Sequence, residues 1–411
     1  MIVDFDLKRG ISAFEVDDYV TSLRCLEPLA IKGNSIAQLY MGYMHMSGYG
    51  DVISENSVQA QHWFSLAAHQ GNAEAQFQYA LRFLLSKQNI ESNLDAISWL
   101  EKAAKQGHEI AKNNLKVRHF DFLVKLPDDA KSFHVLTRLA KYENCSAQFI
   151  LGVAYDTGCF GVQQDLSNAA FWYRKAAEAG STAAQTNLGM MYARGIGISQ
   201  DSFEACKWYL KAAEQGEAVA QHNLGLMCEH GRGVPKNDVL AAEWYLKAAN
   251  QGFDLAQHNI GLAYKFGRGV AKDGGLAYQW FMKATEHGNA GAQFQVGRCL
   301  ECGTGVRQNY AEAAKWYRLA SEQDEAMACQ NLGYLYEHGY GVPKDHREAM
   351  AFYRKGAELG LASSQCCLAF MYQQGENTPK DLGESIKWYR EAANKGDQRA
   401  IDALARLNVR S

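Results

Sequence analysis

Cysteine pairs at short spacing can bind zinc or exchange a disulfide, and this chain has one such pair in Cys299-Leu300-Glu301-Cys302. A zinc site needs four ligands, yet the sequence has no second C-x-x-C and no H-x-x-x-H to complete one. A thioredoxin-type redox pair requires a βαβ unit, which the sequence pattern around these cysteines does not indicate. The pattern therefore favours neither zinc binding nor redox chemistry.

Histidines could also bind a metal or act as general bases. His222 and His258 both stand in a Gln-His-Asn triplet, 36 residues apart. Adjacent packed helices would place them about 10 Å apart, too far to share a metal. We interpret them as structural or surface-lining residues. Because no Ser/His/Asp or Cys/His constellation, carboxylate pair or cofactor fingerprint is found, we expect no enzymatic activity, no cofactor and no metal.

Glycine pairs such as Gly231-Arg232-Gly233 could cradle a phosphate if a strand preceded them and a third glycine opened a helix. Here a helical pattern precedes the pair and Asn237 follows it. We therefore predict a turn that ends one helix in the left-handed conformation and an Asp or Asn that caps the next. The predicted N-caps are Asp201, Asn237, Asp273, Asn309, Asp345 and Asp381.

These features recur because the chain is a repeat array with a period of mostly 36 residues. Each unit reads A-Q-x-x-L-G-x-x-Y, G-x-G-V, then A-x-x-W-Y-x-K-A-A-x-x-G, which predicts two amphipathic helices. A glycine inside the first helix indicates close approach of the second helix. All eight tryptophans occupy one slot of the second helix, where we expect core packing. The units are anchored at Ala37, Ala75, Ala111, Ala147, Ala184, Ala220, Ala256, Ala292, Ala328 and Ser364, with Ala400 opening a half-unit.

The repeats define the expected organisation of the chain. We expect an N-terminal capping helix in residues 1–36, from about Ser12 to Ala30, and the first two repeats in 37–110. Residues 111–146 lack the glycine turn and the tryptophan, so they are a degenerate repeat and a candidate hinge. Seven regular repeats occupy 147–399, and a C-terminal helix in 400–411 caps the stack.

Composition excludes several classes of partner. The 411-residue chain has a net charge of −3 and no run of Lys or Arg, which disfavours nucleic acid and anionic membranes. No segment is apolar and long enough for a signal peptide or a membrane span. Its ten cysteines do not follow the repeat, which is typical of free thiols in a reducing compartment. We expect a cytoplasmic protein.

The motifs resemble the Sel-one-like repeat family, a relative of the tetratricopeptide repeat, over about residues 12 to 407. The resemblance implies an all-α fold, a right-handed α/α superhelical solenoid of about ten 36-residue helix-turn-helix repeats with half-repeat caps. It also implies a concave surface lined by first helices, and a role as an adaptor. One secreted branch is rich in paired cysteines and is linked to penicillin binding, and the cysteine scatter here departs from that branch.

Binding residues should lie where the units differ, at the third, seventh and tenth positions counted from each anchor. These positions mix aromatic, aliphatic and histidine side chains with an acidic fringe, which suits an extended peptide or a basic helix. The alternative is that they pack on the neighbouring unit. The predicted partner-binding groove consists of Phe77, Phe149, Met190, His222, Leu226, Glu229, His258, Leu262, Phe294, Arg298, Tyr334 and Phe370.

The sequence thus predicts a non-catalytic scaffold that binds a partner protein or peptide in its groove and regulates a bacterial signalling or assembly pathway. An enzyme-inhibiting regulatory or immunity protein is one alternative. Another is a hydrolase or cell-wall-ligand binder like the cysteine-rich branch, which a signal peptide and cysteine pairs in each unit would support. Fold alone does not name the partner.

Overall fold

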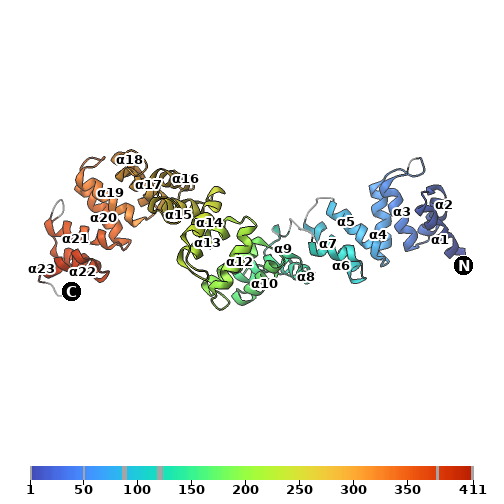
Figure 1. The fold of residues 1–411 in the computed structure, drawn as a ribbon. Helices are drawn as coiled ribbons and strands as arrows, with labels where there is room; N and C mark the ends of the chain where they lie inside the picture. The colour runs from blue at the N-terminus through green and yellow to red at the C-terminus, as the bar shows by residue number, and fades with distance from the viewer. Residues whose placement is uncertain are drawn as a thin grey trace. The chain divides into compact units, whose positions relative to one another are not determined.

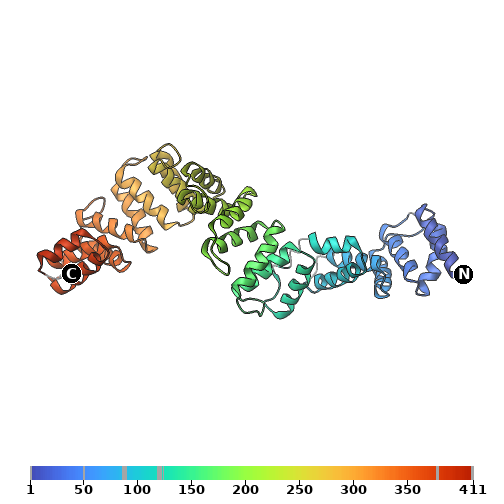
Figure 2. The ribbon, with the colours of Figure 1, turned by 60° about the horizontal axis from the view of Figure 1, so that its bottom comes forward.

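Figure 1 shows the computed structural model, which describes residues 2–49, 51–85, 90–117, 123, 125–375 and 379–408. The described chain is all-α apart from one isolated bridge between Tyr49 and Ile53. The helices fall into two compact units, Met1–Gln200 and Asp201–Ser411. In each unit consecutive helices lie side by side, within a repeat and from one repeat to the next, with the exception of α7 and α8 (Figure 1, Figure 2).

Most helices have 13 residues, in keeping with the 36-residue period. The first unit contains α1 (Ile2–Glu15), α2 (Tyr19–Ile31), α3 (Ser35–Ser47), α4 (Ser57–His69), α5 (Ala73–Leu85), α6 (Ile90–Lys105), α7 (Glu109–Val117), α8 (Ala130–Lys141), α9 (Cys145–Thr157), α10 (Leu166–Glu178) and α11 (Thr182–Arg194). The second contains α12 (Ser202–Glu214), α13 (Ala218–His230), α14 (Asp238–Asn250), α15 (Asp254–Phe266), α16 (Gly274–Thr285), α17 (Ala290–Cys302), α18 (Tyr310–Glu322), α19 (Ala326–His338), α20 (His346–Glu358), α21 (Ala362–Gln374), α22 (Leu382–Asn394) and α23 (Gln398–Arg406).

The helix ends follow the predicted capping pattern. Asp201 accepts hydrogen bonds from the backbone N–H groups of Phe203 and Glu204, at 2.9 and 3.0 Å. All six predicted caps act in this way on the second helix of their repeat. The first helix ends on a left-handed glycine, as at Gly231 with φ of 66°. The predicted caps and glycine turns are therefore confirmed.

The glycine inside the first helix marks the closest approach of the two helices of a repeat. A Cβ on Gly297 would lie 2.6 Å from Cε1 of Tyr317, a fully buried ring on α18. Gly225 and Gly261 face Tyr245 and Phe281 at the same distance. The predicted close approach is confirmed, because a side chain here would overlap the ring of the second helix.

The second glycine of each turn contacts the preceding repeat. A Cβ on Gly269 would lie 1.9 Å from the carbonyl oxygen of Asp238, at the start of α14. Gly233 and Gly305 stand equally close to Ser202 and Gly274. Backbone thus packs directly on backbone between repeats, which only glycine permits.

Buried glutamines connect the repeats. The side-chain amide of Gln221 donates to the carbonyl oxygen of Ala213 at 3.1 Å, and its own oxygen accepts from Gln251 at 2.8 Å. The same donation is made by Gln38, Gln76, Gln148, Gln185, Gln257 and Gln365 to an alanine carbonyl eight residues earlier. The glutamine after each anchor is therefore part of the inter-repeat contact, since its donor is satisfied inside the stack.

The prediction that all eight tryptophans are core residues needs correction. Trp208, Trp244 and Trp280 are buried, whereas the other five are half-buried. The aromatic residue after the tryptophan points more directly inward and is the deeper one, as at Tyr317. At Trp99, Trp208, Trp244 and Trp280 the lysine three residues later lies over the indole, with the Nζ atom of Lys247 3.8 Å from the Trp244 ring centroid.

The N-terminus differs from the expected lone helix over Ser12–Ala30. Two helices, α1 and α2, meet at Val16–Asp18, where Asp17 has a φ of 62° and Asp18 caps α2. A Cβ on Gly10 would lie 2.6 Å from Leu26, the same relation that other repeats show between first-helix glycine and second-helix core residue. Residues 2–31 therefore form a helix pair of the repeat type.

The expected degenerate repeat is described from α7 onward. The described part of α7, Glu109–Val117, packs on α6, while α8 packs on α9. Residues 118–122 and 124 of the candidate hinge lie outside the described residues. At the other end, α23 is a single nine-residue helix that packs on α22, in the position expected for the C-terminal cap.

Candidate interaction surface

The twelve residues predicted to bind a partner are divided between the two units. Phe77, Phe149 and Met190 lie in the first unit, and the other nine lie on the first helices of the second unit. Phe77 and His222 are buried, at 7% and 6% exposure, and Tyr334 and Phe370 are exposed, at 40% and 48%. The remaining eight are half-buried. Exposure is thus concentrated at the seventh position, toward the C-terminal end of the second unit.

Third-position side chains pack inside their own repeat. The His222 and Tyr245 ring centroids are 5.7 Å apart, and the Phe294 and Tyr317 centroids are 5.9 Å apart. Phe149 packs on Tyr173 in the same way in the first unit. Part of each ring is therefore used to bury the second-helix aromatic, which leaves the seventh position as the more accessible row.

Tenth-position carboxylates bind the buried tyrosines. The hydroxyl of Tyr245 donates to Glu229 at 2.7 Å, and that of Tyr353 donates to Glu337 at 2.6 Å. Burial, followed by the hydrogen bond to Glu229, raises the pKa of Tyr245. Arg268 of the next turn also contacts Glu229, at 2.7 Å. The acidic fringe therefore has a structural role inside the repeats.

The repeat 254–289 supports this pairing of tyrosine and carboxylate, because it lacks both partners. Its second-helix aromatic is Phe281, which has no hydroxyl, and its tenth position is Lys265 in place of an acid. Lys265 instead donates to Gln295 of the next repeat at 2.8 Å. Burial lowers the pKa of this lysine. In this repeat the second-helix aromatic has no hydroxyl to donate, and the tenth position has no acid to accept a hydrogen bond.

Asn259 connects the two histidines of the Gln-His-Asn triplets. Its amide nitrogen donates to Nε2 of His222 at 3.1 Å, and its oxygen lies 3.4 Å from Nδ1 of His258. Burial lowers the pKa of both histidines, because the protein interior disfavours the imidazolium. Both are held neutral in a hydrogen-bonded chain between repeats. This arrangement supports the structural interpretation of His222 and His258.

The described residues provide no metal centre. No group of three or more His, Cys, Asp and Glu side chains within them could hold a metal ion. All ten cysteines are free thiols, and in the C-x-x-C pair Cys299 is buried while Cys302 is exposed. Burial raises the pKa of Cys299, so its thiolate is disfavoured.

One cavity lies on the predicted surface of the second unit. It has a volume of about 460 Å³ and is bounded by α19, α21, α22 and α23. Phe370 and Glu337 line it beside Tyr389, Arg399 and Arg406. The cavity joins seventh- and tenth-position side chains to the C-terminal helix, which the sequence analysis treated only as a cap.

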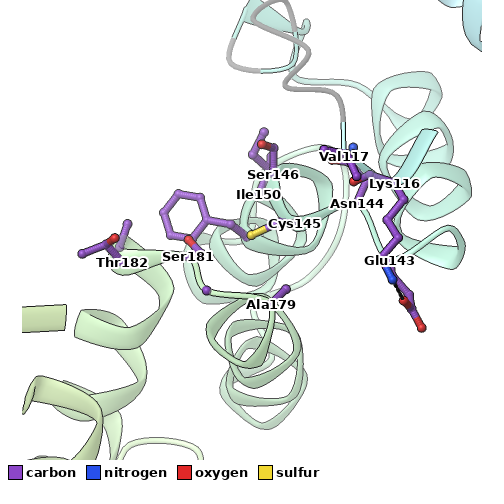
Figure 3. Close-up of a pocket in the computed structure, with 13 residues that line it drawn as sticks. Lys116, Val117, Glu143, Asn144, Cys145, Ser146, Ile150, Ala179, Ser181 and Thr182 are labelled. Atoms are coloured by element: carbon purple, nitrogen blue, oxygen red, sulfur yellow. Dashed lines mark hydrogen bonds and ion pairs between the residues drawn. The ribbon is translucent and has the colours of Figure 1, made fainter. Parts of the chain in front are cut away.

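A larger cavity of about 630 Å³ lies in the first unit, where the degenerate repeat meets α9. Figure 3 shows Lys116 and Glu143 on one side of it and Ser181 and Thr182 on the other. Lys116 and Glu143 form an ion pair at 2.6 Å. The cavity adjoins α7, and Phe149 is the predicted site residue that lines it.

Three aromatic residues near Tyr334 were missed by the sequence analysis: Tyr310, His338 and Tyr340. Tyr310 begins α18, and Tyr340 is the middle residue of the glycine turn after α19. A signal was present, because the turn position holds Ile196, Arg232, Arg268 or Thr304 in four other repeats, whereas Tyr340, like Tyr49 of the first repeat, is aromatic.

Comparison with protein families identifies the repeats. The Sel1 repeat model matches residues 35–72, 73–108, 145–181, 182–217, 218–253, 254–289, 290–325, 326–361 and 362–397. The chain belongs to the Sel1 repeat family. The unmatched segment 109–144 in this Sel1 repeat protein coincides closely with the predicted degenerate repeat.

Solved structures of Sel1 repeat proteins are similar over most of the chain. The protein c5321, described as a protective antigen present in uropathogenic Escherichia coli strains, is 31% identical with a TM-score of 0.71, over 92% of this chain and 80% of that one. A Sel1 repeat protein from Oxalobacter formigenes is 30% identical with a TM-score of 0.59, over 80% and 93%. Comparison with curated proteins gives no significant match. No described helix is long and apolar enough to cross a membrane.

Proposed function

We propose that this Sel1 repeat protein is a non-catalytic, cytoplasmic scaffold that binds a partner protein or peptide on the first-helix face of its second unit, and so regulates a bacterial signalling or assembly pathway. The binding row is the seventh position, Leu226, Leu262, Arg298, Tyr334 and Phe370, with Phe294 beside it. Met190 and Phe149 occupy corresponding positions in the first unit.

The exposure of Tyr334 and Phe370 carries this proposal. Both project from first helices that bury leucines such as Leu332 and Leu368, and Phe370 lines the 460 Å³ cavity that ends at α23. Large aromatic side chains that remain exposed on a rigid scaffold favour protein recognition, because their burial contributes strongly to binding. The hydrogen-bonded glutamines and tyrosines hold this face in a fixed conformation before binding, which limits the entropic cost of association.

The test is affinity capture from the lysate of the native host, with bound proteins identified by mass spectrometry. The variant is Phe370→Ala with Arg298→Ala, and the matched control is Phe203→Ala with Val239→Ala, which removes exposed side chains from the second helices α12 and α14. Circular dichroism should show unchanged helicity in both variants.

We expect a partner that binds wild type and control and is lost from the Phe370/Arg298 variant. If the Phe370/Arg298 variant still captures the partner and the control does not, the binding face lies on the second helices. Failure of wild type to retain any protein would count against a scaffold role.

A further inference from the structure

Four aromatic rings gather on the surface of the second unit. Tyr310 and Tyr340 are stacked with centroids 5.3 Å apart, and His338 stacks on Tyr340 at 5.5 Å. Tyr334 lies 4.2 Å from His338 and 6.0 Å from Tyr340. We call these four residues the tyrosine cluster. Tyr334 and Tyr340 are exposed, at 40% and 41%, so part of each side chain is open to solvent.

Elsewhere in the chain, arginines lie over aromatic rings of the repeats. Arg174 lies over Tyr192, 5.6 Å from the ring centroid, and donates to its hydroxyl. Arg318 does the same to Tyr336. In the part of the chain that the structure describes, no lysine or arginine lies over a ring of the tyrosine cluster. The cluster therefore has the cation-binding ring faces without a cation of its own.

The cluster is accompanied by the carboxylate of Glu337, which forms no ion pair among the described residues, although Arg399 and Arg406 line the same cavity. Glu337 is one helical turn beyond Tyr334 on α19, and it accepts only the hydroxyl of Tyr353 among the described residues. Glu301 of the preceding repeat differs, because Arg298 is 3.2 Å from it. Desolvation, followed by interactions with neighbouring groups that include Glu301 and Glu337, raises the pKa of Tyr334. Two acidic side chains are therefore near enough to act on this hydroxyl.

We propose that the tyrosine cluster and Glu337 form a subsite for an arginine side chain of the partner protein. A guanidinium stacks on tyrosine rings and can donate to a carboxylate at the same time, which the compact ammonium of lysine does less well. This inference rests on the proposed scaffold function and specifies the chemistry of the partner at one end of the binding row.

The direct test uses a probe and does not depend on knowing the partner. The tripeptide acetyl-Gly-Arg-Gly-amide is titrated into full-length protein labelled with ¹³C in its tyrosine rings, and the Tyr334 and Tyr340 resonances are followed by NMR. We expect chemical shift changes that saturate with peptide concentration. The peptide affinity obtained from them should fall about tenfold in Tyr340→Ala and in Glu337→Gln. The matched peptide with citrulline in place of arginine, which has the same shape and no charge, should bind about tenfold more weakly.

Both substitutions are chosen so that the fold should be preserved. Glu337→Gln keeps an oxygen for Tyr353, because the next repeat already pairs Tyr389 with Gln373 at 3.0 Å. Tyr340 is an exposed turn residue. Phe203→Ala serves as the control, since it removes an exposed ring from α12 and should leave the titration unchanged.

Equal binding of the arginine and citrulline peptides would overturn the inference, as would unchanged affinity in both variants. Lysate capture separates it from the proposed function. A partner lost from the Phe370/Arg298 variant but kept by Tyr340→Ala with Glu337→Gln would refute the arginine subsite and leave the scaffold role standing. Arginine-dependent peptide binding by a protein that captures no partner would support the subsite and contradict the scaffold role.

Discussion

Replacing Gly297 with alanine tests how closely the two helices of a repeat are packed. The added methyl group would lie 2.6 Å from a ring carbon of Tyr317, which is fully buried. The ring cannot move away freely, because its hydroxyl bonds to Glu301 and accepts from Asn331. The substitution must therefore displace a side chain that is fixed at both ends.

The expected magnitude comes from opposing effects. Alanine is favoured over glycine inside a helix by about 1 kcal/mol. Overpacking a buried site costs about 1–3 kcal/mol, and each weakened hydrogen bond to Tyr317 costs about 1 kcal/mol more. We expect Gly297→Ala to lower the free energy of unfolding by about 2 kcal/mol. Gly383→Ala is the matched control, because its methyl group would meet only Asp381 at 3.3 Å, and it should be neutral or stabilise by up to about 1 kcal/mol.

The assay is urea denaturation followed by circular dichroism. Repeat arrays often depart from two-state unfolding, so the midpoint of the transition that contains α17 and α18 is compared at fixed conditions. In a Tyr317→Ala background the Gly297→Ala change should no longer destabilise. The packing argument would be refuted if the Gly297→Ala protein were as stable as wild type. It would also be refuted if Gly297→Ala lowered stability by the same amount in the Tyr317→Ala background as in wild type.

Other predictions concern the core, the histidines and the thiols. Trp244→Ala should destabilise by about 3 kcal/mol and Trp316→Ala by clearly less, since Trp316 is half-buried; equal shifts in their urea midpoints would contradict this order. The lowered pKa values of His222 and His258 mean that stability is fully present above the unfolded pKa, about 6.5, and falls as the pH drops below it. A double His→Asn variant at these positions should show a flatter pH dependence of the midpoint between pH 7 and 5. A thiol reagent should label Cys302 in the folded protein before any of the buried cysteines, as peptide mapping would show.

Local features of the fold were predictable because each depends on a few neighbouring residues. An aspartate such as Asp201 caps a helix whatever surrounds it, and a glycine pair such as Gly231 and Gly233 specifies a turn. Their repetition also made the helix pairing predictable. The break at Asp17 was not, because the residues around it carry no glycine or proline to mark a turn.

The candidate site was less predictable, since exposure depends on how far a neighbouring repeat covers each position. His222 and Phe370 both looked accessible by their place on the helix, yet Phe253 and Tyr245 pack around His222. The tyrosine–carboxylate pairs could have been found by comparing units, because Phe281 occurs with Lys265 and Phe64 with Met46. The residue types at these two positions vary together from repeat to repeat, and periodicity alone does not reveal this correlation.

The contact made by the turn glycines also bears on how such a chain can change in length. Gly269 and Gly305 each fit against the first residue of the preceding second helix, and Gln257 and Gln221 each donate to the end of one. Each repeat that has these residues therefore presents to the next repeat the same kind of surface that it packs against. Duplication or deletion of such a repeat would rejoin matching surfaces, whereas an insertion between a second helix and the following first helix would separate a buried amide from its acceptor eight residues earlier. Binding surfaces of different length can thus arise in steps of one repeat, while the packing between repeats stays the same.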